Sequence, residues 1–332
     1  MAVETRRPDC RNERGVALVV ALLALGVIAA LAAMLANEFV IALRRSQNQL
    51  VGEQAWEYLL GAEELASVVL ERDTNSSRDH LGELWAQGVQ AYEIEDGWLT
   101  GQLEDLQGRF NLALLSRSAT AGEPQPAVPA SENERRFMRL LQAVGGADVD
   151  EARARALTEA VIDWIDPDME ETGFGGAEDS LYGRREPALR AANRVPASVS
   201  ELRAVEGMDA PLFAALAPEL SVWPAAGVAI NVNTARPALL RSLAGASLQP
   251  LPEPRLAELL AARSEAGFKD LQEFADNPAW DGEPPTLGLG EQSDYFLLRA
   301  EVEYRGLRWR MESVLARRNG SVRAIARSLG AL

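Results

Sequence analysis

The chain contains almost no cysteine or histidine, and this scarcity limits the chemistry that it can support. Among its 332 residues there is one cysteine, Cys10, and one histidine, His80. The chain beyond Cys10 cannot form an internal disulfide, so a metal ion is the obvious alternative for cross-linking and stabilising the fold. The motifs G-x-S-x-G, H-E-x-x-H and G-x-x-x-x-G-K-[ST] are also missing, and we expect His80 to be exposed in a loop. These absences argue against an enzyme.

Basic residues are also fewer than acidic ones. The sequence has 33 Lys and Arg residues against 49 Asp and Glu, for a net charge of -16. Such acidity disfavours nucleic acid and anionic membrane surfaces as partners and suits cations. The one basic stretch of note is the leader that ends in RNERG before residue 16. The positive-inside rule therefore keeps this end in the cytoplasm and predicts that the acidic bulk is periplasmic in a bacterium.

The longest hydrophobic run covers residues 16–36 and contains no charge. At about 1.5 Å per residue it spans roughly 31 Å, enough to cross a bilayer core. A secretory signal peptide fits poorly, because its apolar region is shorter and ends in an A-x-A-like site. Residues 37–72 continue without proline and carry an apolar stripe at Ala55, Leu59, Ala62, Ala66 and Val69. The pattern predicts one helix, first transmembrane and then amphipathic, on the order of 85 Å long.

Strand-like patterns occur at both ends of the remaining chain, with helical patterns between them. One or two strands are expected within residues 92–112, and three more within 295–306, 307–318 and 321–329, the last after an Asn319-Gly320 hairpin turn. The intervening chain predicts helices at 133–144 and 148–165 and short helices over 187–278. The predicted fold class is α+β, in which the early and late strands form one antiparallel sheet and a large all-α domain is inserted between them.

An acidic loop follows the second of these helices. Residues 163–182 carry seven carboxylates and no Lys or Arg, a density that is unfavourable unless a cation screens it. Asp166, Asp168 and Glu170 occupy positions one, three and five of an EF-hand-like spacing. The match then fails, because Glu171 replaces the required glycine and Ala177 replaces the final glutamate. The loop is not an EF-hand.

A longer loop that folds back satisfies calcium coordination better. In that arrangement Glu178 and Asp179 close a shell begun by the first three carboxylates. Asp163, at the end of a helix pattern, is expected to contact an arginine instead. Two alternatives stay open at this point: a solvated acidic loop without an ion, and a catalytic Mg²⁺ site.

Several segments together resemble a known family. The Gly15 junction, the uncharged run and the long helix resemble the type IV pilin-like class. Three further segments resemble the K-type minor pseudopilins of type II secretion (GspK): DLQGRFNL at 105–112, DWIDPDMEETGFGGAEDSLY at 163–182 and INVNTA at 230–235. The resemblance implies that a prepilin peptidase cuts after Gly15 and leaves Val16 as the first residue. It also implies a structural calcium ion in the acidic loop.

The same resemblance implies an architecture and a set of partners. The expected parts are a leader (1–15), a transmembrane segment (16–36), its amphipathic continuation (37–72), a pilin-like domain (73–115 and 288–332) and an inserted helical domain (116–287) with the metal loop at 163–183. The insert would contain SAM-like or helix-hairpin-helix modules. Expected partners are the I-type and J-type minor pseudopilins, the major pseudopilin, the prepilin peptidase and inner-membrane lipid, but no nucleic acid. Val20 stands where most pilin-like subunits have a glutamate, which suits a place at the tip of a pseudopilus.

The two short motifs allow more specific expectations. Thr234 is expected to cap the following helix, with Pro237 in its first turn, while Asn231 and Asn233 bind backbone groups. Asp105, Arg109 and Asn111 in DLQGRFNL either form a functional cluster or have internal roles, with Arg109 ion-paired and Phe110 in the core. Because INVNTA-like sequences occur in DNA-uptake proteins, a helix-hairpin-helix DNA adaptor is one alternative function. A membrane-anchored periplasmic metal-dependent hydrolase is the other.

Overall fold

The computed structural model describes residues 13–73, 77–116, 130–243, 247–264, 266–282, 284–285 and 287–329, with side chains from Gly15 onward. The chain divides into two compact units, residues 1–57 and 58–332. Most of the predicted leader lies outside the described residues. The same holds for most of residues 116–134, a stretch rich in Pro, Ala, Ser and Glu whose composition predicts a flexible connection. The domain boundaries proposed from the sequence stay predictions.

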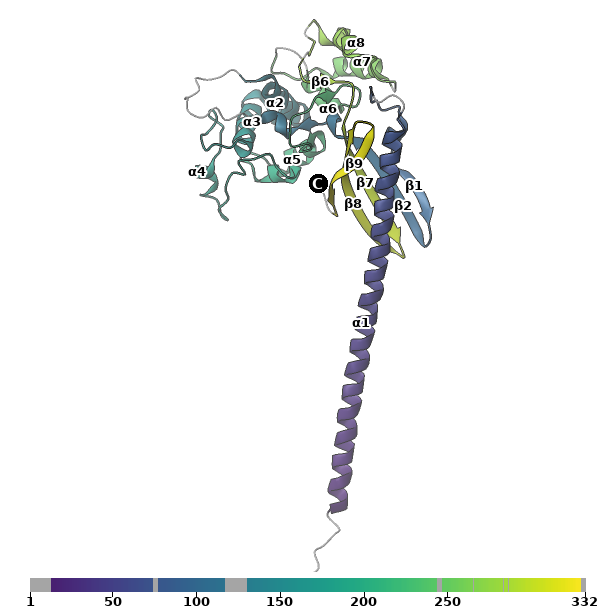
Figure 1. Cartoon of the computed structure of the whole chain (residues 1–332). Helices are drawn as coiled ribbons and strands as arrows, with labels where there is room; N and C mark the ends of the chain where they lie inside the picture. The colour runs from purple at the N-terminus through teal and green to yellow at the C-terminus, as the bar shows by residue number, and fades with distance from the viewer. Residues whose placement is uncertain are drawn as a thin grey trace, which may run out of the picture. The chain divides into compact units, whose positions relative to one another are not determined.

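The first unit is built on helix α1, which runs without interruption from Glu13 to Glu71 (Figure 1). Its apolar side chains from Val16 to Leu43 are exposed. The helix is long and apolar enough to cross a membrane, and none of its most apolar window is buried within the structure. The predicted long helix is therefore confirmed, and its first part is a candidate membrane anchor.

The second unit contains a five-stranded sheet in the order β1-β2-β7-β8-β9, with every neighbouring pair antiparallel. The strands are β1 (Gln90–Ile94), β2 (Gly97–Asp105), β7 (Tyr295–Tyr304), β8 (Leu307–Arg318) and β9 (Ser321–Ser328). In Figure 1 the blue strands β1 and β2 lie beside the yellow strands β7 to β9, although the helical region separates them in sequence. The predicted sheet, formed from both ends of the chain, is confirmed.

Two tight turns connect the late strands. Arg305 and Gly306 join β7 to β8, and Asn319 and Gly320 join β8 to β9, with positive φ at all four residues. Two successive positive φ angles define the type I′ turn, whose twist matches that of a hairpin. The hairpin predicted at Asn319-Gly320 is therefore confirmed.

The end of α1 packs within the second unit through one apolar stripe. Leu59, Ala62, Ala66 and Leu70 are buried there, whereas the predicted last position of the stripe, Val69, is only half-buried. Glu63 accepts hydrogen bonds from Ser313 of β8 and from Arg327 of β9, each at 2.7 Å. The stripe and the ion pair together attach the helix end to the sheet.

The helical region lies between β2 and β7 in the sequence, although these two strands are neighbours in the sheet. Its α-helices are α2 (Glu132–Gly145), α3 (Glu151–Ile165), α4 (Asp179–Tyr182), α5 (Ala210–Leu216), α6 (Pro237–Ser242), α7 (Glu253–Arg263) and α8 (Leu271–Ala275). Ser131 and Asp150 cap α2 and α3, because their side chains accept hydrogen bonds from backbone N–H groups three residues on. The short 3₁₀-helices of the second unit are Leu84–Ala86, Leu106–Gly108, Leu112–Leu115, Gly146–Asp148, Val199–Ala204, Ala217–Glu219 and Pro278–Trp280.

Two small parallel strand pairs join the predicted all-α insert to the residues that flank it, and each pair takes one strand from the insert. β3 (Phe110–Asn111) pairs with β4 (Leu220–Ser221), and β5 (Ile230–Asn231) pairs with β6 (Leu289–Gly290). Each strand has two residues, too few to show a period in the sequence. One apolar core fills the region and includes Phe110, Phe137, Leu141, Val161 and Leu240. The two pairs place DLQGRFNL and INVNTA within this core.

Candidate metal centre

Three carboxylates from the acidic segment converge at the end of α3. Asp163 lies in the last turn of α3, Asp166 is the residue after it, and Glu178 immediately precedes α4. Their side chains are 0%, 3% and 2% exposed. One oxygen from each lies within 4.8 Å of the others. Buried carboxylate oxygens gathered at this spacing are suitable ligands for a hard divalent cation.

Asp163 folds the loop back so that Glu178 can reach α3. Its carboxylate accepts hydrogen bonds from the backbone N–H of Thr172 at 3.0 Å and of Ala177 at 2.7 Å. Gly176 is required at the point of closest approach, because a Cβ there would lie 2.5 Å from Asp163 Oδ2. The prediction that Asp163 contacts an arginine is therefore wrong: its partners are backbone amides of the returning loop.

The electrostatics of the cluster would favour a bound cation. Burial, together with the carboxylates of Asp163 and Asp166, raises the pKa of Glu178 to about 7, and the Asp179 N–H opposes the rise only in part. Burial likewise raises the pKa of Asp163. Neither oxygen of Glu178 accepts a hydrogen bond of normal geometry from a residue that the structure describes. A buried carboxylate without such a partner is costly unless a cation coordinates it.

The other carboxylates predicted as ligands lie outside this buried group of three. Asp168 and Glu170 are exposed, and Asp168 accepts a hydrogen bond from the Glu170 N–H at 2.9 Å. Asp179 accepts one from the Ala191 N–H at 2.9 Å. The structure thus gathers Asp166 and Glu178 from the predicted set and adds Asp163. The sequence did carry a signal that Asp163 lies near Asp166, because residues three apart at a helix end share one helix face.

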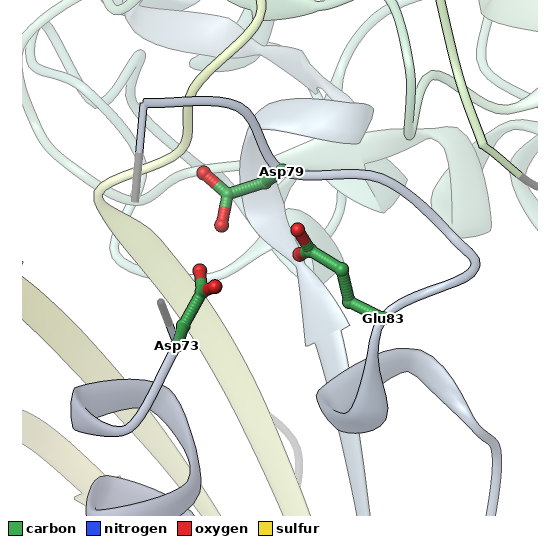
Figure 2. Close-up of side chains that lie close together, drawn as sticks. All are labelled: Asp73, Asp79 and Glu83. Atoms are coloured by element: carbon green, nitrogen blue, oxygen red, sulfur yellow. The ribbon is translucent and has the colours of Figure 1, made fainter. Parts of the chain in front are cut away.

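A second group of carboxylates, which the sequence analysis did not predict, follows α1. Figure 2 shows Asp73, Asp79 and Glu83 with their carboxylates turned toward one another, and one oxygen from each lies within 4.8 Å of the others. Here a cationic side chain is already present. Arg317 of β8 donates to Asp73 at 3.0 Å and to both oxygens of Asp79 at 2.6 and 2.5 Å. This group is an ion-paired junction.

The surroundings of the junction support a structural role. Burial raises the pKa of Asp79, although hydrogen bonds from Arg317 and from the Ser293 N–H act in the opposite direction. Glu83 accepts a hydrogen bond from Trp85 Nε1 at 2.5 Å, and His80 Nε2 lies 3.7 Å from its carboxylate. The prediction that His80 is exposed is wrong, because this residue is half-buried beside Glu83.

The motifs DLQGRFNL and INVNTA meet at Asp105. This buried carboxylate accepts hydrogen bonds from Thr234 Oγ1, from Ser293 Oγ at 2.6 Å and from Asn231 Nδ2 at 3.3 Å. Burial raises its pKa to about 6, against these hydrogen bonds. The prediction that Thr234 caps the following helix is wrong: α6 begins at Pro237, its N-cap is Arg236, and the Thr234 hydroxyl is bonded to Asp105 instead.

The remaining residues of these motifs have internal partners. Asn231 donates to the backbone oxygen of Asp79 at 3.1 Å, and Asn233 Oδ1 accepts the Phe268 N–H at 2.7 Å. Asn111 caps the turn after it by accepting the Ala113 N–H at 2.8 Å. In DLQGRFNL, Arg109 forms an ion pair with Glu104, and Phe110 is fully buried.

Gly108 makes the approach of the two motifs sterically possible. A Cβ at this position would lie 2.7 Å from the backbone oxygen of Thr234, and the Gly108 oxygen accepts the Arg236 N–H at 3.1 Å. The motifs therefore form a buried structural joint between the sheet and the helical region. The predicted cleavage site, Gly15 and Val16, lies in the first turns of α1.

Comparisons with known proteins agree on one family. A family model described as type II secretion system (T2SS), protein K matches residues 108–225, and a second with the same description matches residues 230–292. The type II secretion system protein K of Aeromonas hydrophila is 34% identical over 318 residues, covering 93% of this chain and 95% of its own. The Pseudomonas aeruginosa protein of the same name is 33% identical over 330 residues, covering 96% of this chain and 94% of its own.

A solved structure is similar as well. The crystal structure of the GspK-GspI-GspJ complex from the enterotoxigenic Escherichia coli type 2 secretion system contains a chain that aligns with a TM-score of 0.72. The sequence identity is 27%, and the alignment covers 87% of this chain and all of that one.

Proposed function

Because the chain belongs to the type II secretion system protein K family, we propose that it is the minor pseudopilin at the tip of the secretion pseudopilus. In this role it binds the I-type and J-type minor pseudopilins and supports the export of folded proteins across the outer membrane. The observation that carries the proposal is similarity over nearly the whole chain, both to proteins of this name and to a chain of the GspK-GspI-GspJ complex.

The N-terminal helix supplies the membrane part of this role. The apolar run of α1 would lie in the inner membrane, with the basic leader in the cytoplasm and the acidic second unit in the periplasm. A prepilin peptidase would remove the leader after Gly15. The fifth residue after that cut is Val20, which has no carboxylate to neutralise the amino terminus of a neighbouring subunit in lipid. A subunit of this kind suits the end of a stack.

Calcium is proposed as a structural ion in the second unit. The supporting observation is the Asp163, Asp166 and Glu178 cluster, whose buried carboxylates lie within 4.8 Å of one another. Calcium bound there would join the end of α3 to the start of α4, and so stabilise the returning loop by mass action. The remaining oxygen ligands would come from backbone and water.

The calcium proposal is tested with two isosteric variants of the full chain in detergent. Glu178→Gln removes a charge from the cluster, whereas Glu170→Gln makes the same change at an exposed position of the same loop. Thermal melts with calcium and with EGTA should separate by several degrees in the wild type and in Glu170→Gln, but coincide in Glu178→Gln. If both variants lost the calcium-dependent difference in melting temperature equally, this would support the ligand set proposed from the sequence. If the wild type showed no such difference, this would contradict calcium binding.

We propose a non-enzymatic role, and the burial of the same cluster supports it. A metal-dependent hydrolase needs an open coordination position beside a substrate pocket. The three carboxylates are almost fully buried, and neither the pocket along β7 and β8 nor the pocket beside α7 includes them. The sequence around 206–209 also lacks the Lys and Arg residues that a DNA-binding hairpin would use.

The partner proposal is tested by co-expression with the I-type and J-type pseudopilins of the same bacterium. Size-exclusion chromatography with light scattering should show a complex that contains one copy of each protein. The major pseudopilin serves as the control, because it should not replace either minor subunit in that complex. Migration of the chain as a separate species in the presence of both minor pseudopilins would contradict the proposal.

A further inference from the structure

A pocket of about 290 Å³ lies where β2 meets the helical region. Its walls come from the segment before β1, from β2, from residues 234–237 and from the last residue of α7. Three arginines line it: Arg109, Arg236 and Arg263. Apolar side chains form another part of the wall, namely Leu81, Trp85, Leu103 and Pro237. The pocket therefore combines cationic and apolar surfaces.

Arg263 carries a positive charge that the described part of the chain does not neutralise. It is 8% exposed, and its Nη1 donates to the backbone oxygen of Ala235 at 2.5 Å. Among the described residues, no carboxylate forms an ion pair with it. Burial lowers the pKa of Arg263, and no neighbouring charge counteracts this. A buried guanidinium without a counter-charge is costly, which favours an anionic ligand.

The other charges at the pocket already have partners. Arg109 is paired with Glu104, which Arg299 also contacts. Arg236 is paired with Glu219 at 3.1 Å. Asp105 is engaged by Thr234 and Ser293. The guanidinium of Arg263 is thus the charged group of the pocket that has no side-chain partner among the described residues.

We propose that this pocket binds a single carboxylate group carried by a partner peptide. Arg263 would pair with the carboxylate, Arg236 would contact it from the exposed side, and the Leu81 and Trp85 wall would hold an adjacent apolar side chain. A phosphate dianion fits less well, because the nearby Glu104 and Asp105 repel a second negative charge. This inference goes beyond the proposed function and does not depend on it.

The test uses small carboxylates and the full chain in detergent. The probes are N-acetyl-leucine, which resembles a chain end, acetyl-Leu-Glu-Leu-amide, which carries an acidic side chain, and their neutral counterparts N-acetyl-leucinamide and acetyl-Leu-Gln-Leu-amide. Saturation-transfer NMR titrations should show that at least one carboxylate binds about tenfold or more tightly than its amide. The carboxylate probe that binds more tightly shows whether the pocket prefers a chain end or an acidic side chain. Equal affinity for acids and amides, or stronger competition by inorganic phosphate, would overturn the proposal.

Variants assign the binding to the pocket. Arg263→Met should abolish the preference for the carboxylate, whereas Arg255→Met, at an exposed ion pair on the same helix, should retain it. If Arg263→Met does not fold, Arg263→Lys keeps the charge without the planar fork and should weaken binding about threefold or more. Arg236→Gln should weaken it to a similar extent. Unchanged affinity in the variants that fold would show that the probes bind elsewhere.

Discussion

At the scale of single residues, the protonation of Glu178 would change if the proposed calcium ion were bound beside it. Glu178 is buried beside two other carboxylates and has no well-formed hydrogen bond to a described residue, so burial and these carboxylates together raise its pKa to about 7. Without a cation it is partly protonated at neutral pH. A coordinated calcium ion would displace that proton, so affinity should decrease as pH falls below about 7.

The raised pKa of Glu178 predicts how the metal-free protein responds to pH. Between the ordinary pKa of 4.5 and the folded value of about 7, the folded state binds more protons than the unfolded state. The free energy of unfolding in EGTA should therefore decrease as pH rises from about 5 to about 8, by on the order of 3 kcal/mol. Urea denaturation at both pH values measures this difference.

A matched variant isolates the contribution of this residue. Asp163 and Asp105 also have raised pKa values and change stability in the same direction. Glu178→Gln keeps those two contributions but removes the contribution of Glu178. The free energy of unfolding of this variant should therefore decrease less between the two pH values than that of the wild type. An identical decrease in both proteins would show that Glu178 does not titrate in this window.

At the scale of elements, the junction between the end of α1 and β8 depends on one arginine. Arg317 is 5% exposed and donates to both Asp73 and Asp79. Arg317→Met would leave the fully buried Asp79 without its cation, which predicts a loss of about 3–5 kcal/mol in the free energy of unfolding. Arg310→Met on the same strand, where the ion pair with Glu301 is exposed, should cost less than about 1 kcal/mol. Comparable losses in the two variants would contradict this account of the junction.

The elements also show which interactions a sequence can predict. The long helix, the antiparallel strands and the Asn319-Gly320 turn were predictable because their signals are local. The Thr234 prediction failed because capping is a local rule, whereas its hydroxyl is bonded to Asp105, which lies 129 residues away in sequence. The Asp79–Arg317 pair, 238 residues apart, carried no local signal. Asp166 and Glu178 were expected as ligands, and the three-residue step from Asp163 to Asp166 is a local signal, but only the folded loop brings Glu178 beside Asp163.

At the scale of the whole molecule, the two units suit different surroundings. The first has apolar side chains exposed from Val16 to Leu43, which lipid or neighbouring helices would cover. The second has its own core, the sheet-to-insert joint at Asp105 and the candidate calcium centre. This division is what a secretion pseudopilin requires, with a membrane helix for assembly and a folded head that needs no disulfide.

Processing of the amino terminus tests the central claim most directly. The chain would be purified from a bacterium with an active prepilin peptidase, and the mass of the intact protein would be measured. A pseudopilin should begin at Val16, with Gly15 and the preceding leader removed. A polypeptide that still begins at Met1 under these conditions would contradict the assignment as a pseudopilin.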